Sequence, residues 1–459
     1  MVKRTTQYVC QQCATTYSKW SGRCDNCGAW NSLVEQEKAQ DKKAVIERSQ
    51  GKVLEGASLK DVKIDMIRDR LGSGLSELDE VLGGGILLGG VVLVAGQPGI
   101  GKSTLLLQIA AHVGREHSVL YVSGEESAGQ IRLRAIRLGA DAKNDAKLTL
   151  VASTSADDIA ATIATGQHDL VIVDSMQTVG MSELAAAPGT VSQITNSANI
   201  IIRAAKASNT AVLLVGHVTK EGSIAGPKVL EHLVDVVLQF EGDRYGGFKM
   251  VRAVKNRYGS TSEVAIFEMA ETGLIPVDNP SATLLSERSK ADGSVVLATM
   301  EGNRPLLVEI QALVNPTHFG YPKRTASGFD LNRLTLLIAV LERRTKLNLS
   351  DKDIFINVVG GLRLQDPAAD LAVCMAIASA AAERQIVEGA VVFGEVGLGG
   401  EIRTATQADA RIREAKKLGF DHAIGPKLKQ KDTFIKPVSD LRDALVSYIS
   451  VSTPKSRKG

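Results

Sequence analysis

The sequence predicts an α/β protein built around a nucleotide-binding core, with a small four-cysteine zinc module before it and a second α/β domain after it. A glycine-rich loop between a strand-like run and a helical run, near residue 100, indicates the core. Two close cysteine pairs within the first 27 residues indicate the zinc module. Strands and helices that alternate again after about residue 280, without a phosphate loop, indicate the last domain.

The chain of 459 residues is too long for one hydrophobic core, so several domains are expected. The predicted parts are a zinc-binding module at 1–34, a linker at 35–60, an ATPase domain at 61–275, a second α/β domain at 280–450 and a basic tail at 451–459. The linker is charged and has no sustained apolar face, so a solvated helix is the alternative.

The composition is that of a globular protein outside the membrane, with 44% hydrophobic and 23% charged residues. No apolar run reaches the ~18 residues that a membrane span needs. The first residues contain no apolar stretch typical of an export signal, so we expect a cytoplasmic location. A net charge of +3 is compatible with a nucleic-acid partner but does not require one.

The cysteine pairs have the spacing of a zinc site. Cys10 and Cys13 form one C-x2-C pair, and Cys24 and Cys27 form a second pair ten residues later. Each pair offers two thiolates to a tetrahedral Zn²⁺, and a reducing compartment favours metal over a redox disulfide. Four thiolates close the coordination sphere, so the predicted zinc is structural.

Three further aromatic or sulfur-containing residues have expected places in the fold. Both tryptophans of the chain, Trp20 and Trp30, lie in the module and are expected to add apolar mass around the metal. The fifth cysteine, Cys374, lies in the apolar run "DLAVCMAIASAAAE" and is expected to be a buried helix residue. The partner of the module, DNA or protein, stays open.

The segment "VVLVAGQPGIGKSTLLLQIAAHVG" supplies strand, loop and helix in the order of a phosphate-binding loop. In this pattern backbone N–H groups surround the phosphates, the lysine reaches the terminal ones, and the next hydroxyl binds Mg²⁺. The sequence therefore predicts ATP and Mg²⁺ as ligands. The predicted binding residues are Gly96, Gln97, Pro98, Gly99, Ile100, Gly101, Lys102, Ser103 and Thr104, of which Lys102 is also catalytic.

Polar residues end the next apolar strands. Glu125 follows "SVLYVSG", Asp174 ends "HDLVIVD" and His217 ends "TAVLLVGH". Because ligands bind at the carboxyl ends of parallel strands, we predict that Asp174 serves Mg²⁺ and that Glu125 deprotonates the attacking water. Charge placement at a helix N-terminus is the alternative for Glu125 and, more strongly, for its neighbour Glu126. His217 could equally be a satisfied polar residue at a strand end.

Later strands form an antiparallel extension of the sheet. Lys255 and Arg257 lie in "KNRYG" on this extension, far along it from the phosphate loop. Side chains alternate along a strand, so both cations point the same way and an anion should face them. We predict that this anion is ATP on an adjacent copy, where a cation can accelerate phosphoryl transfer. A positive strand face open to water is the alternative.

Two loops are candidates for DNA contact. Lys220 and Lys228 lie in "VTKEGSIAGPKVLEH", and the segment "AAAPGTVSQITNSANIIIRAAKASN" (185–209) has a loose polar start that leads into a helix. Lysines in loops are often simply solvated, so both interpretations stay open.

The motifs together resemble the RadA (Sms) family of bacterial DNA repair and recombination proteins, within the RecA-like ATPase superfamily. The resemblance spans the chain through the four cysteines, "GQPGIGKST", "VSGEES", "VIVDS", "GHVTKEGSIAGP" and "KNRYG". The family usually has Phe where Tyr258 stands, which keeps the aromatic ring. The resemblance implies a RecA-like P-loop ATPase forming a hexameric ring, single-stranded and branched DNA and a RecA-type recombinase as partners, branch migration as the role, and a nucleoid-associated location.

The C-terminal region resembles the proteolytic domain of Lon proteases, which use a Ser-Lys dyad. In "DPAAD" Ala368 stands at the position of the nucleophile, and Asp409 stands at that of the lysine. Alanine cannot attack a carbonyl and aspartate cannot supply the amine, so we predict a Lon-protease-like domain without proteolysis. Segments 318–333 and 411–417 are basic and are candidate DNA surfaces, with solvated faces as the alternative.

The leading hypothesis is a DNA-dependent ATPase that moves along DNA as a helicase. The alternative is an ATP-switched adaptor that loads or stabilises the recombinase without motor activity. Both hypotheses use every motif above, so the sequence does not separate them.

Overall fold

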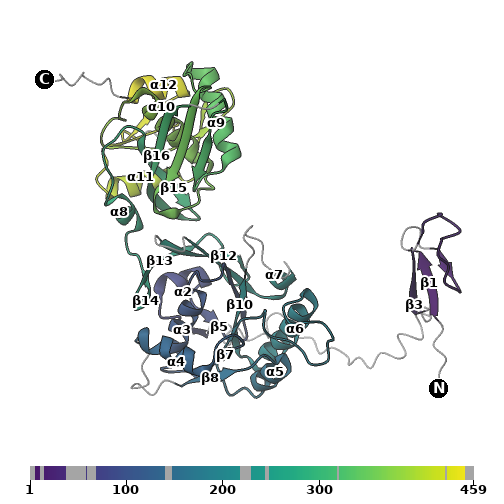
Figure 1. Ribbon diagram of the computed structural model, residues 1–459. Helices are drawn as coiled ribbons and strands as arrows, with labels where there is room; N and C mark the ends of the chain where they lie inside the picture. Colours follow the sequence, from purple (N-terminus) through teal and green to yellow (C-terminus); the bar gives the residue numbers. More distant parts are fainter. Residues whose placement is uncertain are drawn as a thin grey trace, which may run out of the picture. The chain divides into compact units, whose positions relative to one another are not determined.

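The computed structural model describes residues 6–10, 15–30, 32–37, 58, 69–139, 147–217, 229–242, 248–317, 320–429 and 432–449 (Figure 1). The chain divides into two compact units, residues 1–64 and 65–459. Each unit has hydrophobic cores of its own.

The first unit contains a small antiparallel sheet in the order β2-β1-β3. Its strands are β1 (Thr6–Cys10), β2 (Thr16–Tyr17) and β3 (Leu33–Glu37). Among the described residues, its core consists of Cys10, Cys24 and Leu33, against which Tyr8 and Tyr17 pack. A core of this size does not stabilise a fold unaided, which is why small modules of this kind rely on a bound metal.

In the described part of the second unit, the first large sheet has nine strands in the order β14-β13-β12-β11-β6-β10-β9-β7-β8. The strands from β11 to β8 are parallel, and β12, β13 and β14 continue the sheet antiparallel, as predicted. Their bounds are β6 (Val91–Gly96), β7 (Val119–Ser123), β8 (Leu148–Ala152), β9 (Leu170–Asp174), β10 (Ala211–His217), β11 (Val236–Gly242), β12 (Phe248–Asn256), β13 (Val264–Ala270) and β14 (Gly273–Pro276).

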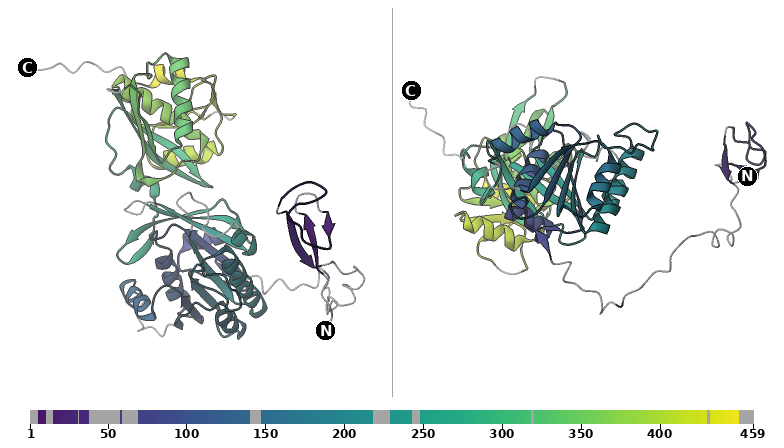
Figure 2. Two further views of the ribbon diagram at one scale, coloured as in Figure 1. Left: turned by 45° about the vertical axis from the view of Figure 1, so that its right-hand side comes forward. Right: turned by 90° about the horizontal axis from the view of Figure 1, so that it is seen from below.

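Helices cover both faces of this sheet (Figure 2). Val92 and Val94 of β6 share one core with α2, α3 and α4, whereas Val91 and Leu93 share the other with α5, α6 and α7, because successive strand residues point to opposite faces. The helices are α2 (Ser76–Leu82), α3 (Lys102–Val113), α4 (Ala128–Arg137), α5 (Ala156–Ala164), α6 (Val191–Ser208) and α7 (Val229–Leu233). A short hairpin of β4 (Arg70–Leu71) and β5 (Ile86–Leu87) precedes β6.

The C-terminal region contains a second sheet, for which the described residues give the order β17-β18-β16-β15-β19-β22-β23, and a separate pair β20-β21. The strands are β15 (Ser294–Glu301), β16 (Arg304–Pro316), β17 (Arg324–Ser327), β18 (Lys352–Val358), β19 (Ala390–Val392), β20 (Glu395–Val396), β21 (Ile402–Arg403), β22 (His422–Gly425) and β23 (Ile435–Pro437). The helices are α8 (Pro280–Leu285), α9 (Leu331–Thr345), η3 (Val359–Gly361), η4 (Pro367–Ala369), α10 (Asp370–Ala382), α11 (Ala408–Lys417) and α12 (Leu441–Tyr448).

Helix α10 lies inside this domain. Every residue from Asp370 to Ala380 is buried, including Cys374, as its apolar sequence predicts. Asp370 is the charged residue in this run, and its carboxylate accepts hydrogen bonds from Arg333 and from the Val396 N–H. Among the described residues, no helix combines the length and apolarity that crossing a membrane requires.

A polar pair lies beside the two positions that match the protease dyad. Ala368 is buried in η4, and Asp409 lies in the first turn of α11. Asp366, at the N-cap of η4, forms a 2.6 Å ion pair with Arg411 of α11, and the Arg411 side chain is completely buried. The ion pair joins η4 to α11, and the loss of proteolysis stays a prediction from Ala368 and Asp409.

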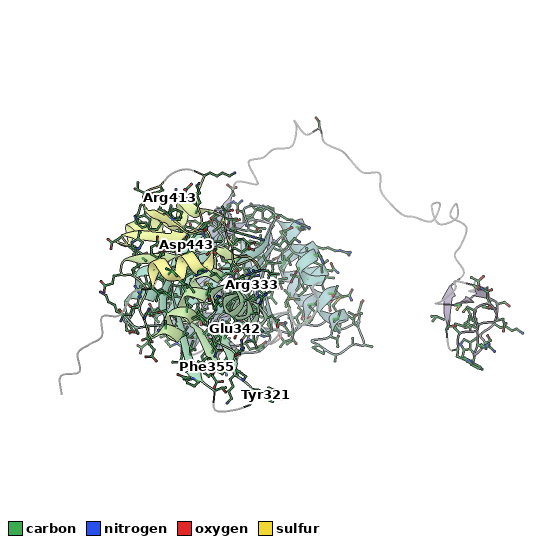
Figure 3. The ribbon with its side chains drawn as sticks, turned by 90° about the horizontal axis from the view of Figure 1, so that it is seen from above. Tyr321, Arg333, Glu342, Phe355, Arg413 and Asp443 are labelled. Atoms are coloured by element: carbon green, nitrogen blue, oxygen red, sulfur yellow. The ribbon has the colours of Figure 1, made fainter. Side chains whose placement is uncertain are left out.

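The two basic segments proposed as DNA surfaces are only partly available at the surface (Figure 3). Arg411 is buried, and Arg333 is only partly exposed and bound to buried Asp370, so neither cation is freely available to a surface ligand. Tyr321 is 87% exposed, and Arg413 is exposed on α11. His318 and Phe319 lie outside the described residues, as do the tail, the loop that carries Lys220 and Lys228, and most of the predicted linker. Residues 35–37 of that linker belong instead to β3, so the module extends farther than the predicted boundary at residue 34.

Candidate nucleotide site and zinc centre

The phosphate loop connects the buried strand β6 to α3. Gly99 and Gly101 have φ values of 76° and 119°, which lie in the left-handed region that glycine adopts readily. Gly101 is the N-cap of α3 and carries no capping side chain, so the first N–H groups of the helix are available to a ligand. The positive end of the helix dipole points at the same place, which favours a phosphate.

Lys102, the first residue of α3, is folded back over the phosphate loop that precedes it. Its Nζ donates to the Gly96 carbonyl at 2.9 Å and the Gln97 carbonyl at 3.0 Å, and it contacts His217 Nδ1 at 3.1 Å. Burial lowers the pKa of Lys102 to about 8, although the nearby carboxylates of Asp174 and Glu125 favour its charged form. The ammonium is therefore held where a terminal phosphate would replace the carbonyl contacts.

Two carboxylates meet this ammonium from neighbouring strands. Glu125 Oε1 accepts a 2.5 Å hydrogen bond from Ser175 Oγ and lies 3.5 Å from His217 Nε2. Asp174 is buried and accepts a 2.7 Å hydrogen bond from the Tyr121 hydroxyl. Burial, and then the Asp174 carboxylate, raises the pKa of Tyr121 well above its usual range, so the phenol stays a donor.

The strand registers explain why these side chains converge. His217 pairs with Gly96, and Ser123 pairs with Asp174, so the carboxyl ends of β6, β10, β9 and β7 lie at one edge of the sheet. An ammonium, a metal-binding carboxylate and a second carboxylate beside a hydroxyl are the groups that phosphoryl transfer to water uses. Ser175 and Tyr121 were not among the predicted site residues. The only signal for them in the sequence was their position, since Tyr121 lies inside an apolar strand and Ser175 directly follows one.

Glu126 lies at the start of helix α4, which was the alternative given for it in the sequence analysis. Its carboxylate pairs with Arg134 of α4 at 2.5 Å, and its N–H donates to Ser123 Oγ at 2.9 Å. Ser127 then caps α4 through a reciprocal hydrogen-bond pair with Gln130. Glu126 thus belongs to the start of α4, whereas Glu125 faces Lys102 and His217.

Lys255 and Arg257 lie toward the opposite end of the sheet. Lys255 pairs with Val237 of β11, which pairs with Leu93 of β6, and the N–H of Arg257 donates to the Asp235 carbonyl one step farther from the loop. Asp235 is level with Val91, which precedes Gly96 by five residues, or about 16 Å along a strand. The guanidinium therefore does not reach the phosphate loop of its own chain.

Within the chain, the C-terminal end of α7 and the following turn hold both cations. Lys255 Nζ donates to the carbonyls of Glu231 and Val234, each at 2.7 Å, as expected for a cation at a helix C-terminus. Arg257 Nη1 lies 2.9 Å from Asp235 Oδ1, yet its side chain remains 51% exposed. Burial, and then the adjacent Arg257 charge, lowers the pKa of Lys255, so the two cations do lie side by side.

Asp235 is the residue that sequence reasoning missed at this end. Its side chain is 2% exposed, and it accepts hydrogen bonds from the Val91 N–H at 3.1 Å and from Lys206 at 3.3 Å besides Arg257. It also faces the phenol of Tyr258, whose pKa is raised to about 12 by burial first and by this carboxylate second. The Asp235 carboxylate thus links Val91, at the start of β6, to Arg257 of "KNRYG" through hydrogen bonds. The available signal was an aspartate inside the apolar run "LVDVVLQF".

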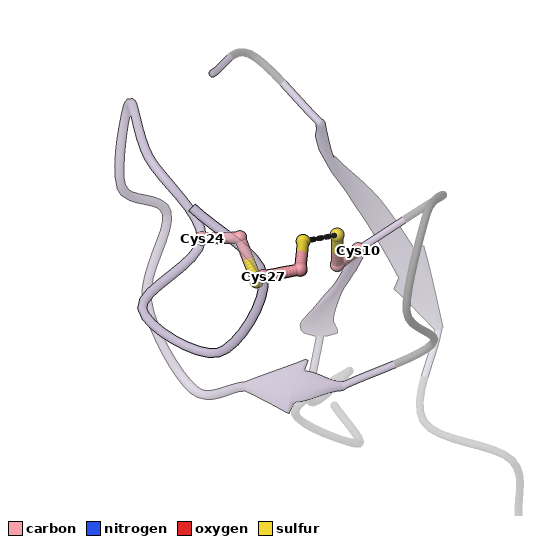
Figure 4. A group of neighbouring side chains, drawn as sticks. All are labelled: Cys10, Cys24 and Cys27. Atoms are coloured by element: carbon pink, nitrogen blue, oxygen red, sulfur yellow. Dashed lines mark hydrogen bonds between the residues drawn. The ribbon is translucent and has the colours of Figure 1, made fainter. Parts of the chain in front are cut away.

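The cysteine module brings three predicted ligands together (Figure 4). The Sγ atoms of Cys10, Cys24 and Cys27 all lie within 4.8 Å of one another, and those of Cys10 and Cys27 are 3.6 Å apart. Four thiolates around Zn²⁺ at about 2.3 Å would be about 3.8 Å apart, so the spacing suits zinc. Cys13, the fourth predicted ligand, lies outside the described residues.

The tryptophans of the module do not pack around this centre, so that expectation was wrong. Trp20 is 58% exposed and Trp30 is 73% exposed. Among the described residues, Cys10, Cys24 and Leu33 form the core, and Tyr8 and Tyr17 pack against it.

Over nearly its whole length, the chain is similar to proteins named DNA repair protein RadA. It is 44% identical to the RadA of Aquifex aeolicus (strain VF5) over 448 residues, which cover 97% of this chain and 99% of that protein. It is 46% identical to the RadA of Bacillus subtilis (strain 168) over 431 residues, 93% of each chain. The chain belongs to the RadA family.

Three family models divide the RadA chain in the same order as its structure. The model described as "Rubredoxin metal binding domain" matches residues 8–35, "AAA domain" matches 59–223 and "Subunit ChlI of Mg-chelatase" matches 335–429. The crystal structure of the RadB recombinase is also similar, with 21% identity, a TM-score of 0.37 and coverage of 45% of this chain and all of that one. The predicted fold class, a RecA-like core between a zinc ribbon and a Lon-like domain, is confirmed.

Proposed function

We propose that this RadA chain is a DNA-dependent ATPase that works as a ring-shaped homo-oligomer, a hexamer, and drives branch migration during recombination and DNA repair. One observation carries the proposal. The groups that face a triphosphate lie at one end of the sheet, and Lys255 and Arg257 lie toward the other end. A complete site then needs two copies of the chain.

In the proposed reaction, the N–H groups of the loop 96–104 bind the phosphates and Lys102 exchanges its carbonyl contacts for the terminal phosphate oxygens. Glu125 orients the attacking water and accepts its proton, with Ser175 and His217 fixing the carboxylate. Ser103 and Asp174 would hold Mg²⁺, and Tyr121 orients the aspartate. Magnesium supplies charge neutralisation to the phosphate oxygens.

The cations complete the site from the adjacent copy. Arg257 is half exposed, so its guanidinium can leave Asp235, or share it, when a neighbour's triphosphate approaches. A cation provided in this way stabilises the charge that develops on the transferred phosphoryl group. Asp235 keeps the unliganded "KNRYG" segment in place without occupying the exposed side of the arginine.

DNA and a recombinase are the proposed partners. The relatives are named DNA repair proteins, and DNA contact by loops around the site would couple hydrolysis to movement. A protein with these partners would act in the cytoplasm at the nucleoid.

The test is strand displacement on a forked DNA with the unaltered chain and with Lys102→Ala. We expect ATP-dependent unwinding by the unaltered chain and none by the variant. DNA-stimulated hydrolysis without any unwinding would contradict the motor and identify the chain as an ATP-switched adaptor of the recombinase.

Loss of zinc should affect the ribbon alone. Replacing Cys10 and Cys13 by serine is expected to unfold residues 1–34 because the remaining core is too small, while basal ATP hydrolysis stays within about twofold. Zinc content and limited proteolysis of the ribbon measure the first effect, and phosphate release measures the second. Abolished basal hydrolysis would show that the ATPase domain depends on the ribbon.

A further inference from the structure

A cavity of about 900 Å³ lies between the ATPase sheet and the C-terminal domain, inside the second compact unit. The two parts are packed together here, because residues of β12 and β13 share one hydrophobic core with β15, β16 and β18. Arg304 also pairs with Glu77 of α2 at 3.0 Å, and the Asn303 N–H donates to the Ser262 carbonyl at 2.7 Å. A cavity of this volume is large enough for a small-molecule ligand.

One wall of the cavity belongs to the phosphate loop. Gly99 and Ile100 line it, and a methyl group placed on Gly99 would meet no atom within 4 Å, so the loop is open on this side. Met269, near the end of β13, lines the cavity next to the loop, since a methyl group on Gly101 would lie only 2.7 Å from Met269 Cε. The cavity therefore begins directly beside the place proposed for the phosphates.

The strand registers put this cavity at the same edge of the sheet as the phosphate loop. Gly96, where the loop begins, pairs with Phe240 of β11, and Gly242 at the end of β11 pairs with Lys249, which lines the cavity. In the sheet order, β12 and β13 lie on one side of β6, and β10, β9 and β7 lie on the other. The cavity and the catalytic carboxylates thus flank the loop from opposite sides.

This order gives a bound nucleotide its direction. Lys102, proposed to hold the terminal phosphate, lies 3.1 Å from His217 of β10, and the Glu125 carboxylate beyond β7 favours its charged form. The terminal phosphate therefore points toward β10 and β7. Because the nucleoside is at the other end of the phosphate chain, it points toward β12 and β13, where the cavity lies.

The wall opposite the loop comes from the C-terminal domain and is polar. Ser327 of β17 pairs with Asn357 of β18, and both residues are exposed and line the cavity. Asn357 Nδ2 donates to Gln311 Oε1 at 3.3 Å, and Gln311 Nε2 donates to Glu309 Oε2 at 3.1 Å. A carboxylate only accepts hydrogen bonds, so buried Glu309 fixes the direction of both amides.

The charges around the cavity indicate what class of ligand fits it. Its lining contains two cations and three acids, namely Lys249, Arg288, Glu268, Glu287 and Glu309. The acids outnumber the cations, so the cavity does not favour a further phosphate or a DNA backbone. An uncharged group with an apolar face and a few polar atoms suits it better, and a nucleoside is such a group.

We propose that this cavity holds the nucleoside of the ATP whose phosphates bind to the loop 96–104. Met269 packs against the nucleoside beside the loop, and Ser327 and Asn357 contact it from the C-terminal domain. The inference rests on the proposed function and deepens it, because the C-terminal domain becomes part of the nucleotide site. A methionine thioether is a favourable neighbour for an aromatic base.

The experiment compares ADP with inorganic pyrophosphate, which carries the same phosphates without the nucleoside. Each is titrated into the full-length chain with Mg²⁺ in a calorimeter. Ser327→Trp places a large side chain in the cavity and should weaken ADP binding about tenfold, while pyrophosphate binding stays within about twofold. Thr325→Trp is the matched control, because Thr325 is exposed on the same face of β17 but does not line the cavity, and it should leave both affinities within about twofold.

Met269→Ala tests the wall beside the loop. Loss of the thioether contact should weaken ADP binding about threefold and leave pyrophosphate binding unchanged, and Met269→Leu, which keeps the apolar volume, should recover most of the loss. The melting temperature of each nucleotide-free variant separates loss of the site from loss of the fold.

Three results would overturn the inference. The first is an unchanged ADP affinity in Ser327→Trp, the second is equal weakening by Ser327→Trp and Thr325→Trp, and the third is equal weakening of ADP and pyrophosphate. Binding is measured without DNA or turnover, so an ADP affinity that follows the expected pattern in a chain that does not unwind DNA would reject only the motor. A chain that binds neither ligand would reject the ATPase and this inference together.

Discussion

The Arg257→Ala chain is expected to bind ATP almost as the unaltered chain does and to hydrolyse it about a thousandfold more slowly, the usual effect of removing a cation that acts on the transferred phosphoryl group. Binding survives because Arg257 is remote from the loop 96–104 in its own chain. Nucleotide affinity from a fluorescent ATP analogue and phosphate release under saturating ATP measure the two quantities. Lys255→Ala should lower hydrolysis in the same direction.

A mixing experiment tests where the arginine acts. Lys102→Ala chains cannot use their own triphosphate but keep Arg257, and Arg257→Ala chains keep a complete phosphate loop. If each site is shared by two copies, mixing the two inactive chains should restore part of the hydrolysis. The restored fraction should match the fraction of subunit interfaces that pair an intact phosphate loop with an intact Arg257. The control is the double variant, which should restore nothing when mixed with either single variant.

Two outcomes would contradict the shared site. One is a mixture as inactive as its components although light scattering shows mixed oligomers. The other is full hydrolysis by a chain that stays monomeric with DNA present. Equal loss of ATP binding and hydrolysis in Arg257→Ala would point instead to the internal role of the Arg257–Asp235 pair, which joins "KNRYG" to the start of β6.

Lys102→Ala should have the second large effect, an ATP affinity about ten- to a hundredfold weaker and hydrolysis below detection. A hydrogen bond to a charged group contributes about 1.5–3 kcal/mol, and the lysine is expected to make more than one. Lys102→Arg keeps the charge but does not fit the cage of the Gly96 and Gln97 carbonyls, so it should recover binding better than hydrolysis.

The same lysine gives a pH dependence with a definite sign. Burial lowers its pKa to about 8 in the nucleotide-free chain, so the charged form is lost as the pH rises through this value. A bound triphosphate favours the ammonium and raises the pKa, so ATP binding near pH 8.5 should take up protons and weaken as the pH rises further. Calorimetry in two buffers with different ionisation enthalpies measures the uptake. An identical binding heat in both buffers would contradict it, and Lys102→Arg, which stays charged, is the control.

Local sequence patterns were sufficient for much of the fold. The order strand, glycine loop and helix located β6 and α3, and apolar runs located β7, β9 and β10, because these features depend on residues within one element. The same is true of the buried α10, whose sequence is apolar all round. Short-range spacing also predicted the thiols that meet in the ribbon.

Contacts between distant residues were not predictable in the same way. Nothing near Asp366 indicates that Arg411 lies beside it, and nothing near Arg257 indicates that Asp235 is its partner, because these pairs depend on how strands and helices pack. The tryptophans are a case in which a contact was predicted but is not found. Hydrophobicity alone favoured a buried place for Trp20 and Trp30, but both side chains are mostly exposed and the described core consists of other residues.

The sequence by itself determined the chemistry that is available, namely a phosphate loop, acidic groups after two strands, two cations in "KNRYG" and four cysteine thiols with the spacing of a zinc site. Only the tertiary structure decided which of these groups share a site. Strand register placed Lys102, Glu125, Asp174 and His217 at one end of the sheet and the cations toward the other, because hydrogen bonds between strands fix the level of every residue along the sheet.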